Sequence, residues 1–203
     1  MIKIPFLLVE LALAVVWLLV RVCVWIKRRK IDKRQEAKLL LLFINLAVIV
    51  RLVFFPLFRQ NGEVLPLLFD VNRILPPNVY LIPFGNFDQY NSINAMWLNI
   101  FGNILLFVPT GAMLPFVFKR LNTFGKVLLT GACMSVCIEL LQLPFFERTT
   151  DINDIILNTA GCALGYGVYL FCKLMKSKRT QKRRPSANKI LSNSRLTFLN
   201  FML

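Results

Sequence analysis

The sequence predicts an all-helical integral membrane protein: a compact bundle of about five transmembrane helices with its N terminus outside and its C terminus inside the cell. First, 57% of the 203 residues are hydrophobic, which is more than soluble domains usually contain. Second, the chain holds five apolar stretches, each close to the length of about 20 residues that a helix needs to cross a bilayer. Third, Lys and Arg are distributed unevenly between these stretches.

The first expected span covers residues 5–26 and is interrupted by Glu10. We expect it to be retained as a helix, because only Lys3 precedes it and no small-residue cleavage site of a signal peptide follows. Residues 27–38 then carry seven Lys or Arg and two acids, as cytoplasmic linkers do. Residues 1–38 therefore form a first helix with a basic cytoplasmic linker.

The second expected span, residues 39–58, contains Arg51. An arginine near mid-membrane costs about 2.5–3.5 kcal/mol unless it is paired or hydrated, so Arg51 should face the bundle or a wet cavity. The proline-rich residues 59–96 that follow are expected to break regular helix. Their aromatic and apolar content favours a position on, or dipping into, the membrane interface.

Three further spans are expected at residues 97–118, 127–146 and 155–175, with a kink near Pro109 in the first of them. Together with the second span they define a transmembrane domain of residues 39–175. Residues 176–203 form a basic cytoplasmic tail, which is expected to be disordered near its charges.

Gly161 and Gly165 form a GxxxG pair in the last expected span. In a membrane such a pair lets two helices approach closely. Because the pattern is common by chance, we interpret it as helix packing within the bundle and not as a dimerisation motif.

The basic residues set the expected orientation. Seven Lys or Arg lie in the linker after the first span, three in the loop after the third, and nine in the tail from Lys173. The opposite side carries four: Lys3, Arg59, Arg73 and Arg148. The positive-inside rule therefore places the N terminus outside and the C terminus inside.

Polar residues follow helical faces in the last third of the chain. Glu139 and Gln142 are three residues apart, and Asp151, Asp154 and Asn158 repeat at intervals of three and four. Each set occupies one side of a helix. Asp151 and Asp154 also suit a helix start, where carboxylates bind free amide groups and face the positive end of the dipole. A capping role for these two residues is therefore an alternative to a role in a site.

The intramembrane polar residues converge in depth. At 1.5 Å per residue, Arg51, Asn103, Glu139 and Asn158 come from four spans, yet each lies within roughly 10 Å of the outer boundary. Arg148 and the two aspartates lie just above them. Ionisable residues inside a membrane are functional candidates by default. A purely structural network, with Arg51 paired to Glu139, is the alternative.

Composition excludes several other classes of function. The sequence has no histidine, so imidazole bases and the usual zinc and haem ligands are missing. Its five cysteines lie in apolar runs without a CxxC pair and are interpreted as small core residues. No metal site and no cofactor are expected. The net charge of +15 accompanies no nucleic-acid motif, so no nucleic-acid partner is expected either.

Several motifs together resemble those of the VanZ-like family. They are NxLxFxPxG from Asn103 to Gly111, Glu139 with Gln142, Arg148, and DxxDxxxNxxGxxxG from Asp151 to Gly165. Arg51 and the LIPF run at residues 81–84 are also similar to the family. The resemblance implies a multi-pass protein of the bacterial cell membrane, of a type associated with low-level resistance to the glycopeptide teicoplanin.

The leading functional hypothesis is an outer-leaflet polar pocket that binds the head group of an envelope lipid, a lipid-linked wall precursor or a glycopeptide. Arginine forms bidentate bonds with phosphate or carboxylate, and amides add neutral hydrogen bonds. The predicted ligand-binding residues are Arg51, Asn103, Glu139, Gln142, Arg148, Asp151, Asp154 and Asn158.

Two other classes of function remain open at this stage. In an enzyme acting on a lipid-linked substrate, Glu139 or Asp154 would serve as the catalytic acid or base. No nucleophile motif accompanies them. In a small transporter, carboxylates within the spans would relay protons, although five spans without an evident repeat are unusual for that class.

Overall fold

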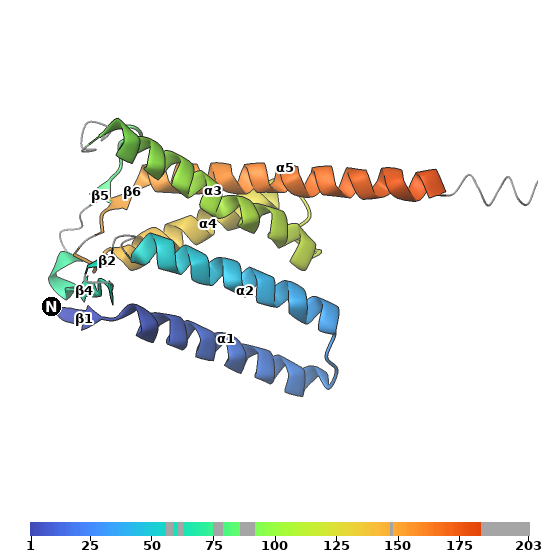
Figure 1. Ribbon diagram of the computed structural model, residues 1–203, viewed down its shortest axis with the longest axis horizontal. Helices are drawn as coiled ribbons and strands as arrows, with labels where there is room; N and C mark the ends of the chain where they lie inside the picture. The colour runs from blue at the N-terminus through green and yellow to red at the C-terminus, as the bar shows by residue number, and fades with distance from the viewer. Residues whose placement is uncertain (56–58, 61–62, 75–78, 86–91, 147, 184–203) are drawn as a thin grey trace, which may run out of the picture.

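The computed structural model describes residues 1–55, 59–60, 63–74, 79–85, 92–146 and 148–183. Across these ranges it has five long helices (Figure 1): α1 (Phe6–Arg28), α2 (Lys33–Phe54), α3 (Ile93–Val117), α4 (Phe124–Gln142) and α5 (Ile152–Arg183). All five are long and apolar enough to cross a membrane. The predicted fold class, a bundle of about five membrane helices, is confirmed.

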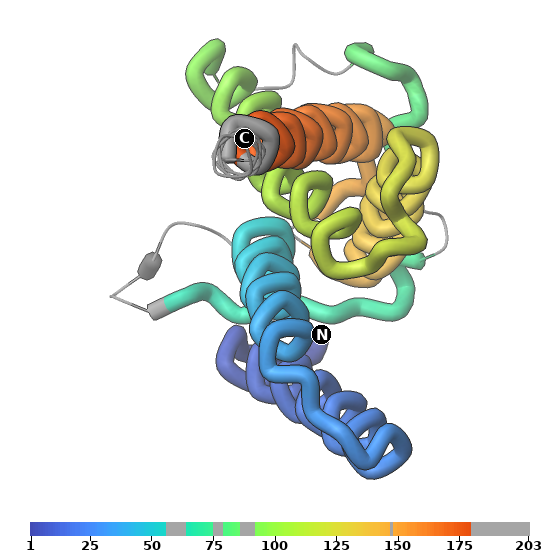
Figure 2. The backbone as a smooth tube through the Cα atoms, turned by 90° about the vertical axis from the view of Figure 1, so that its right-hand side faces the viewer, coloured from blue at the N-terminus to red at the C-terminus, as the bar shows by residue number. Residues whose placement is uncertain are grey.

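The helices are arranged around α3 and α5, which share the largest interface (Figure 1). Helix α4 packs against both, α2 packs against α3, and α1 contacts α2 at the edge of the molecule. The end-on view in Figure 2 shows α1 farthest from α5. The four buried side chains Ile49, Phe107, Val127 and Cys162 place the core between α2, α3, α4 and α5.

The linker after α1 is shorter than expected. The sequence predicted a linker over residues 27–38, but α1 continues to Arg28 and α2 begins at Lys33. Asp32 explains this start, because its carboxylate accepts hydrogen bonds from the backbone N–H groups of Arg34 and Gln35. An aspartate at this position satisfies amides that the first helical turn leaves open.

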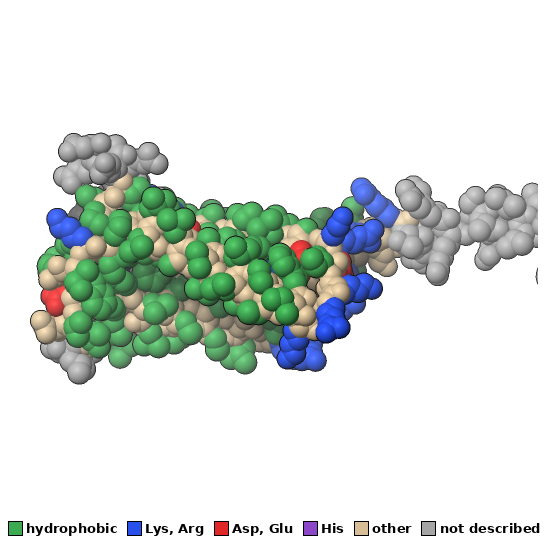
Figure 3. All heavy atoms as spheres, turned by 90° about the horizontal axis from the view of Figure 1, so that it is seen from below, with side chains coloured by type: hydrophobic (Ala, Val, Ile, Leu, Met, Phe, Trp, Pro, Cys, Tyr) green, Lys and Arg blue, Asp and Glu red, His purple; other side chains and the backbone are tan. Residues whose placement is uncertain are grey.

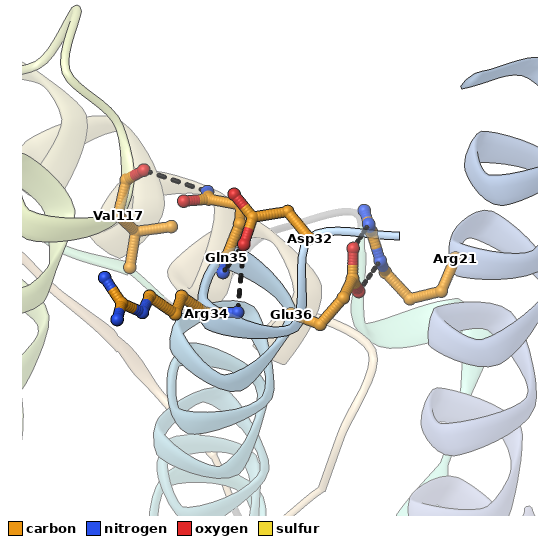
Figure 4. A network of polar contacts seen from close by, with 6 residues as sticks. All are labelled: Arg21, Asp32, Arg34, Gln35, Glu36 and Val117. Atoms are coloured by element: carbon orange, nitrogen blue, oxygen red, sulfur yellow. Dashed lines mark hydrogen bonds and ion pairs between the residues drawn. The ribbon is translucent and has the colours of Figure 1, made fainter. Parts of the chain in front are cut away.

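An ion pair beside this turn fastens α1 to α2 (Figure 4). The guanidinium of Arg21 makes a two-point contact with the Glu36 carboxylate, with Nε donating to Oε2 over 2.9 Å. Arg21 is only 8% exposed, so its charge requires such a partner. Gln35 continues the connection inward, because its Nε2 donates to the Val117 carbonyl at the end of α3 over 3.1 Å.

The tail was expected to be disordered near its charges, but α5 continues as a helix to Arg183. Lysine and arginine are good helix formers, and positive charge is favourable at the C-terminal end of a helix dipole. A 32-residue helix is longer than the roughly 20 residues that span a bilayer, so its basic end projects beyond the apolar layer. Residues 184–203 of the predicted tail lie outside the described part of the chain.

Short strands occupy the other end of the bundle, where the sequence predicted only a break in helix. β1 (Ile2–Ile4) pairs antiparallel with β4 (Leu67–Phe69), and β2 (Arg59–Gln60) pairs with β3 (Glu63–Val64). β5 (Val79–Tyr80) runs parallel to β6 (Thr150–Asp151), and a 3-10 turn covers Val71–Arg73. These pairings satisfy backbone groups close to the apolar layer, where an open group is costly.

The strand β4 also contacts the segment after α4. Asp70 donates its backbone N–H to the Pro144 carbonyl over 2.9 Å, and Phe146 donates to the Leu68 carbonyl over the same distance. Segments from three distant parts of the sequence therefore meet at this end of the bundle, which we call the strand end.

The basic side chains gather at the opposite end (Figure 3). That end holds the α1–α2 turn, the α3–α4 turn and the end of α5, while the N terminus lies at the strand end (Figure 1). The three groups of basic residues counted in the sequence thus share one end of the molecule. Which end faces the cytoplasm stays a prediction from the positive-inside rule.

A close contact between backbones joins α3 to α5. A Cβ atom on Gly161 would lie 2.2 Å from the Ile104 carbonyl oxygen, and one on Gly165 would lie 2.1 Å from that of Val108. From the α3 side, a Cβ on Gly111 would lie 2.1 Å from the Cys162 carbonyl oxygen. Only glycine allows this approach, so the GxxxG pair packs two helices within one chain, as the sequence predicted.

We predict that Gly165→Ala lowers the stability of the folded protein by about 1–3 kcal/mol or more, because α3 and α5 must separate. Gly167→Ala is the matched control on the same helix, since a Cβ there meets nothing within 4 Å. Thermal unfolding in detergent should show a lower Tm for the first variant and an unchanged or higher Tm for the second. Equal Tm values would contradict the contact.

We also predict the orientation in the membrane. In a cysteine-free background, a cysteine in place of Lys30, in the α1–α2 turn, should react with a membrane-impermeant maleimide only after the cells are opened. A cysteine in place of Thr149, at the strand end, should react in intact cells. The expectation follows from the charge asymmetry, and the reverse labelling pattern would overturn it.

Candidate functional site

Asp154, near the start of α5, connects this helix to α3. Its Oδ1 accepts a hydrogen bond from Asn103 Nδ2 over 2.6 Å, and the Asn99 side chain also bonds the carboxylate. Asn99 and Asn103 are one turn apart on α3, so both reach the same group. Asp154 is partly exposed. Its carboxylate is thus held by two amides of α3.

Asp151 has the capping role that the sequence left open for both aspartates. It immediately precedes α5, and its Oδ1 accepts from the backbone N–H of Asn153 over 2.9 Å. This is the hydrogen bond that an N-cap carboxylate makes. Asp154 instead bonds to side chains of a different helix. The capping hydrogen bond is therefore made by Asp151, while Asp154 lies in the first turn of α5, near the positive end of its dipole, and bonds to α3.

Glu139 lies on the face of α4 that meets these residues and is 2% exposed. Its Oε2 accepts from the Asp151 backbone N–H over 3.0 Å, and its carbonyl oxygen accepts from the Thr150 hydroxyl over 3.0 Å. The carboxylates of Asp151 and Asp154 lie near enough to interact with it electrostatically. Among the described residues, no basic side chain forms an ion pair with Glu139.

The expected pair between Arg51 and Glu139 is therefore wrong. Arg51 points toward α1: its guanidinium lies 5.2 Å from the centre of the Phe6 ring and interacts electrostatically with Glu10. Its Nη1 also donates to the Phe55 carbonyl over 3.1 Å. Similar depth in the membrane did not place the two side chains on facing sides of their helices.

Three predicted site residues converge on the last carbonyls of α2. Gln142 Nε2 donates to the Val53 oxygen over 3.1 Å, and Arg148 Nε donates to the Phe54 oxygen over 3.2 Å. Arg51 donates to the carbonyl oxygen of the next residue, Phe55. The final carbonyls of a helix have no partner within it and carry the negative end of its dipole, which explains why cationic and amide donors collect there.

Arg148 also interacts electrostatically with Asp154, so it links the end of α2 to the carboxylates. Like Asp154, it is partly exposed. We call Glu139, Asp151 and Asp154, with Arg148 and the amides Asn99 and Asn103, the acidic cluster. Its members come from α3, α4, α5 and the segment between the last two helices.

Asn158 lies one turn beyond Asp154 on α5 and is 2% exposed. Its Nδ2 donates to the Ser135 hydroxyl, one turn from Glu139 on α4, over 2.9 Å. Within the described residues, the Asn158 Oδ1 is buried without a hydrogen-bond partner, and the same holds for the Gln142 Oε1. Two buried amide oxygens, one on α4 and one on α5, thus lack a donor in the described structure.

Asn153 is a residue that the sequence analysis missed. It is 1% exposed, and its Oδ1 accepts from the backbone N–H of Phe84 over 2.8 Å. Phe84 has a φ of 60°, a left-handed conformation that is unusual for a bulky residue. Asn153 falls off the face shared by residues 151, 154 and 158, so periodicity could not indicate it. It holds residues 79–85 against the start of α5.

The described residues contain no group of three or more His, Cys, Asp or Glu side chains arranged to hold a metal ion. The cluster offers charge and hydrogen-bonding groups. Its outer members, Arg148 and Asp154, present opposite charges, while the inner members present oxygen acceptors.

Comparison with known sequences identifies the family of the chain. A sequence model of the family described as VanZ/LLP1 matches residues 41–173. The chain belongs to the VanZ/LLP1 family. A curated relative, Protein VanZ of Enterococcus faecium, is 29% identical over 138 residues, which is 66% of this chain and 76% of the relative. No solved structure matches the chain significantly.

Family membership and the five helices establish a multi-pass bacterial membrane protein of the VanZ/LLP1 family. Every residue of the predicted site lies within the matched range, whereas α1 and the residues after 173 lie outside it. The match therefore includes the acidic cluster and the end of α2, but not the ion pair that fastens α1.

We predict that Asn103 and Asp154 are energetically coupled. A double-mutant cycle with Asn103→Ala and Asp154→Ala should give a coupling energy of about 1–2 kcal/mol, because the acceptor is a carboxylate. The neutral pair of Asn45 Nδ2 and Thr110 Oγ1, 2.6 Å apart between α2 and α3, is the control. It should give about 0.6 kcal/mol, the usual value for membrane helices. Additive effects at positions 103 and 154 would contradict the assignment.

Proposed function

We propose that the protein binds the polar head of an amphiphile at the strand end of the bundle. The candidate ligands are an envelope lipid, a lipid-linked wall precursor and a membrane-inserting glycopeptide. The single observation that carries this proposal is the acidic cluster itself, in which the buried Glu139 and Asp151 and the partly exposed Asp154 meet between apolar helices. Burying such groups is costly, and membrane proteins usually retain them where they contact a polar ligand.

The surroundings of the cluster suit a molecule with a polar head and an apolar chain. Leu140 and Leu141 follow Glu139 in the sequence but are 58% and 62% exposed on the outside of α4. On α5, Ile156 is 38% exposed two residues after Asp154. Apolar surface therefore lies within one helical turn of the carboxylates. A ligand whose chain runs along these residues would bring its head to the partly exposed Asp154.

The two arginines at the end of α2 supply the complementary charge. A guanidinium forms charge-assisted, often bidentate hydrogen bonds with phosphate and carboxylate groups. Arg148 is partly exposed beside Asp154, and Arg51 lies at the same end of α2. Phosphate and carboxylate groups occur in all three candidate ligands. The relative named Protein VanZ and the family resemblance favour a role at the cell envelope, including altered handling of teicoplanin.

The proposal predicts that Asp154→Asn loses ligand while remaining folded. Asparagine keeps an oxygen that can accept from Asn103, so expression and Tm should change little. Lipid extracts of the purified wild-type chain should contain a copurifying amphiphile by mass spectrometry, and the variant should retain roughly tenfold less of it. In a host whose teicoplanin susceptibility the wild type lowers, the variant should have no effect.

Asp70→Asn is the matched control at the same end of the molecule. The Asp70 carboxylate accepts from the Asn72 backbone N–H over 3.1 Å, a capping role that asparagine also fills. This variant loses the same charge outside the cluster and should retain wild-type levels of bound amphiphile. Full retention by Asp154→Asn at normal expression, or equal loss in both variants, would overturn the proposal.

A further inference from the structure

We infer that the head group bound by the acidic cluster carries an ammonium group, which lies between the carboxylates of Glu139 and Asp154. This inference rests on the proposed function and adds to it the charge of the ligand. It follows from the balance of charge inside the cluster and from unpaired hydrogen-bond acceptors on the helix faces that carry its carboxylates, and both favour a donor-rich cation.

The charge balance is the first observation. Glu139 interacts electrostatically with Asp154 and Asp151, and all three are acidic. Among the described residues, Arg148 is the basic side chain that acts on Asp154, and Glu139 has no ion-pair partner there. Like charges at short range in a medium of low dielectric are strongly unfavourable unless a cation or protons compensate them. The described part of the cluster thus has more acidic than basic groups.

The hydrogen-bond balance is the second, independent observation. Gln142 and Asn158 are 5% and 2% exposed, and an amide oxygen of each is buried without a donor in the described structure. Gln142 shares the inward face of α4 with Glu139, and Asn158 shares that of α5 with Asp154. Both orphan acceptors therefore lie on the helix faces that carry the two carboxylates. Buried acceptors of this kind require a donor from elsewhere.

A primary ammonium satisfies both conditions because it carries one positive charge and three N–H donors and no acceptor. A phosphate or carboxylate would bring further acceptors and negative charge to the same place. A phosphate or carboxylate would instead bind the partly exposed Arg148 at the outer side of the cluster. The complete head group that suits the site therefore combines an outer anionic group with an inner ammonium.

Ammonium groups of this kind occur on an aminophospholipid and on an amine-bearing glycopeptide. A pair of phospholipids that share the phosphate, of which one carries an amine and the other a neutral alcohol, tests whether the site recognises the ammonium. The purified full-length chain is exchanged into detergent with equal amounts of phosphatidylethanolamine and phosphatidylglycerol of the same acyl chains. Native mass spectrometry then measures which lipid remains bound. We expect a preference for phosphatidylethanolamine of roughly tenfold or more, the scale of one hydrogen bond between charged groups.

Glu139→Gln should reduce this preference to about one. Glutamine keeps an oxygen that accepts from the Asp151 N–H, so the variant tests charge and retains the local structure. If this buried change prevents folding, Asp154→Asn provides the same test on the exposed side of the cluster. Asp70→Asn, outside the cluster, should keep the wild-type preference.

A second arm identifies the source of the ammonium. In phosphatidylglycerol nanodiscs, a lipophilic glycopeptide with a free amine is compared with its N-acetylated form. Binding of the free amine alone would support the inference with an antibiotic as ligand.

Three results would overturn the inference. Equal binding of amine-bearing and amine-free ligands would leave the proposed function intact and remove the ammonium. If Glu139→Gln and Asp154→Asn keep the preference for phosphatidylethanolamine, the ammonium binds elsewhere. Protons would then compensate the charge of the two carboxylates. Binding of no lipid and no glycopeptide by the wild type would reject the inference together with the proposed function.

Discussion

The close approach of α3 and α5 is the constraint on which the polar region depends. Because Gly161 and Gly165 lie against the Ile104 and Val108 carbonyls, the two helices run parallel in a fixed register. Asp154 lies about two turns before Gly161 on α5, and this register brings its carboxylate within reach of Asn103 on α3. A larger residue at either glycine would move the carboxylate away from both of its amide partners. Van der Waals packing between backbones thus sets the geometry of the charged groups.

Three of the residues that the sequence assigned to a binding site serve instead to bond the open carbonyls at the end of α2. Arg51, Gln142 and Arg148 each donate to one of the last carbonyls of α2, a need that arises wherever a helix ends close to an apolar layer. Glu139 and Asp154 are different, because the side chain of neither bonds to an open backbone group at the end of its own helix. Each also interacts electrostatically with another carboxylate. The strongest case for function in this region therefore rests on the acids and less on the arginines.

The sequence alone predicted the helices well and their contacts poorly. Hydropathy located all five spans, because the length of an apolar run is a local property. It could not predict β1 with β4 or β5 with β6, since strands of two or three residues have no periodicity and pair across long separations. Depth along a helix gave the correct end for Arg51 but not the direction of its side chain, so its pairing with Glu139 was wrong. The separate roles of Asp151 and Asp154 needed the three-dimensional contacts.

The pairing of β1 with β4 also bears on how the chain inserts during synthesis. Residues 2–4 precede α1 in the chain, whereas residues 67–69 are made only after both α1 and α2. Strand β1 therefore stays without its pairing partner β4 until α1 and α2 have been made. The β1–β4 hydrogen bonds can then form only after α1 and α2 have inserted, and they hold the two ends of this helical hairpin together.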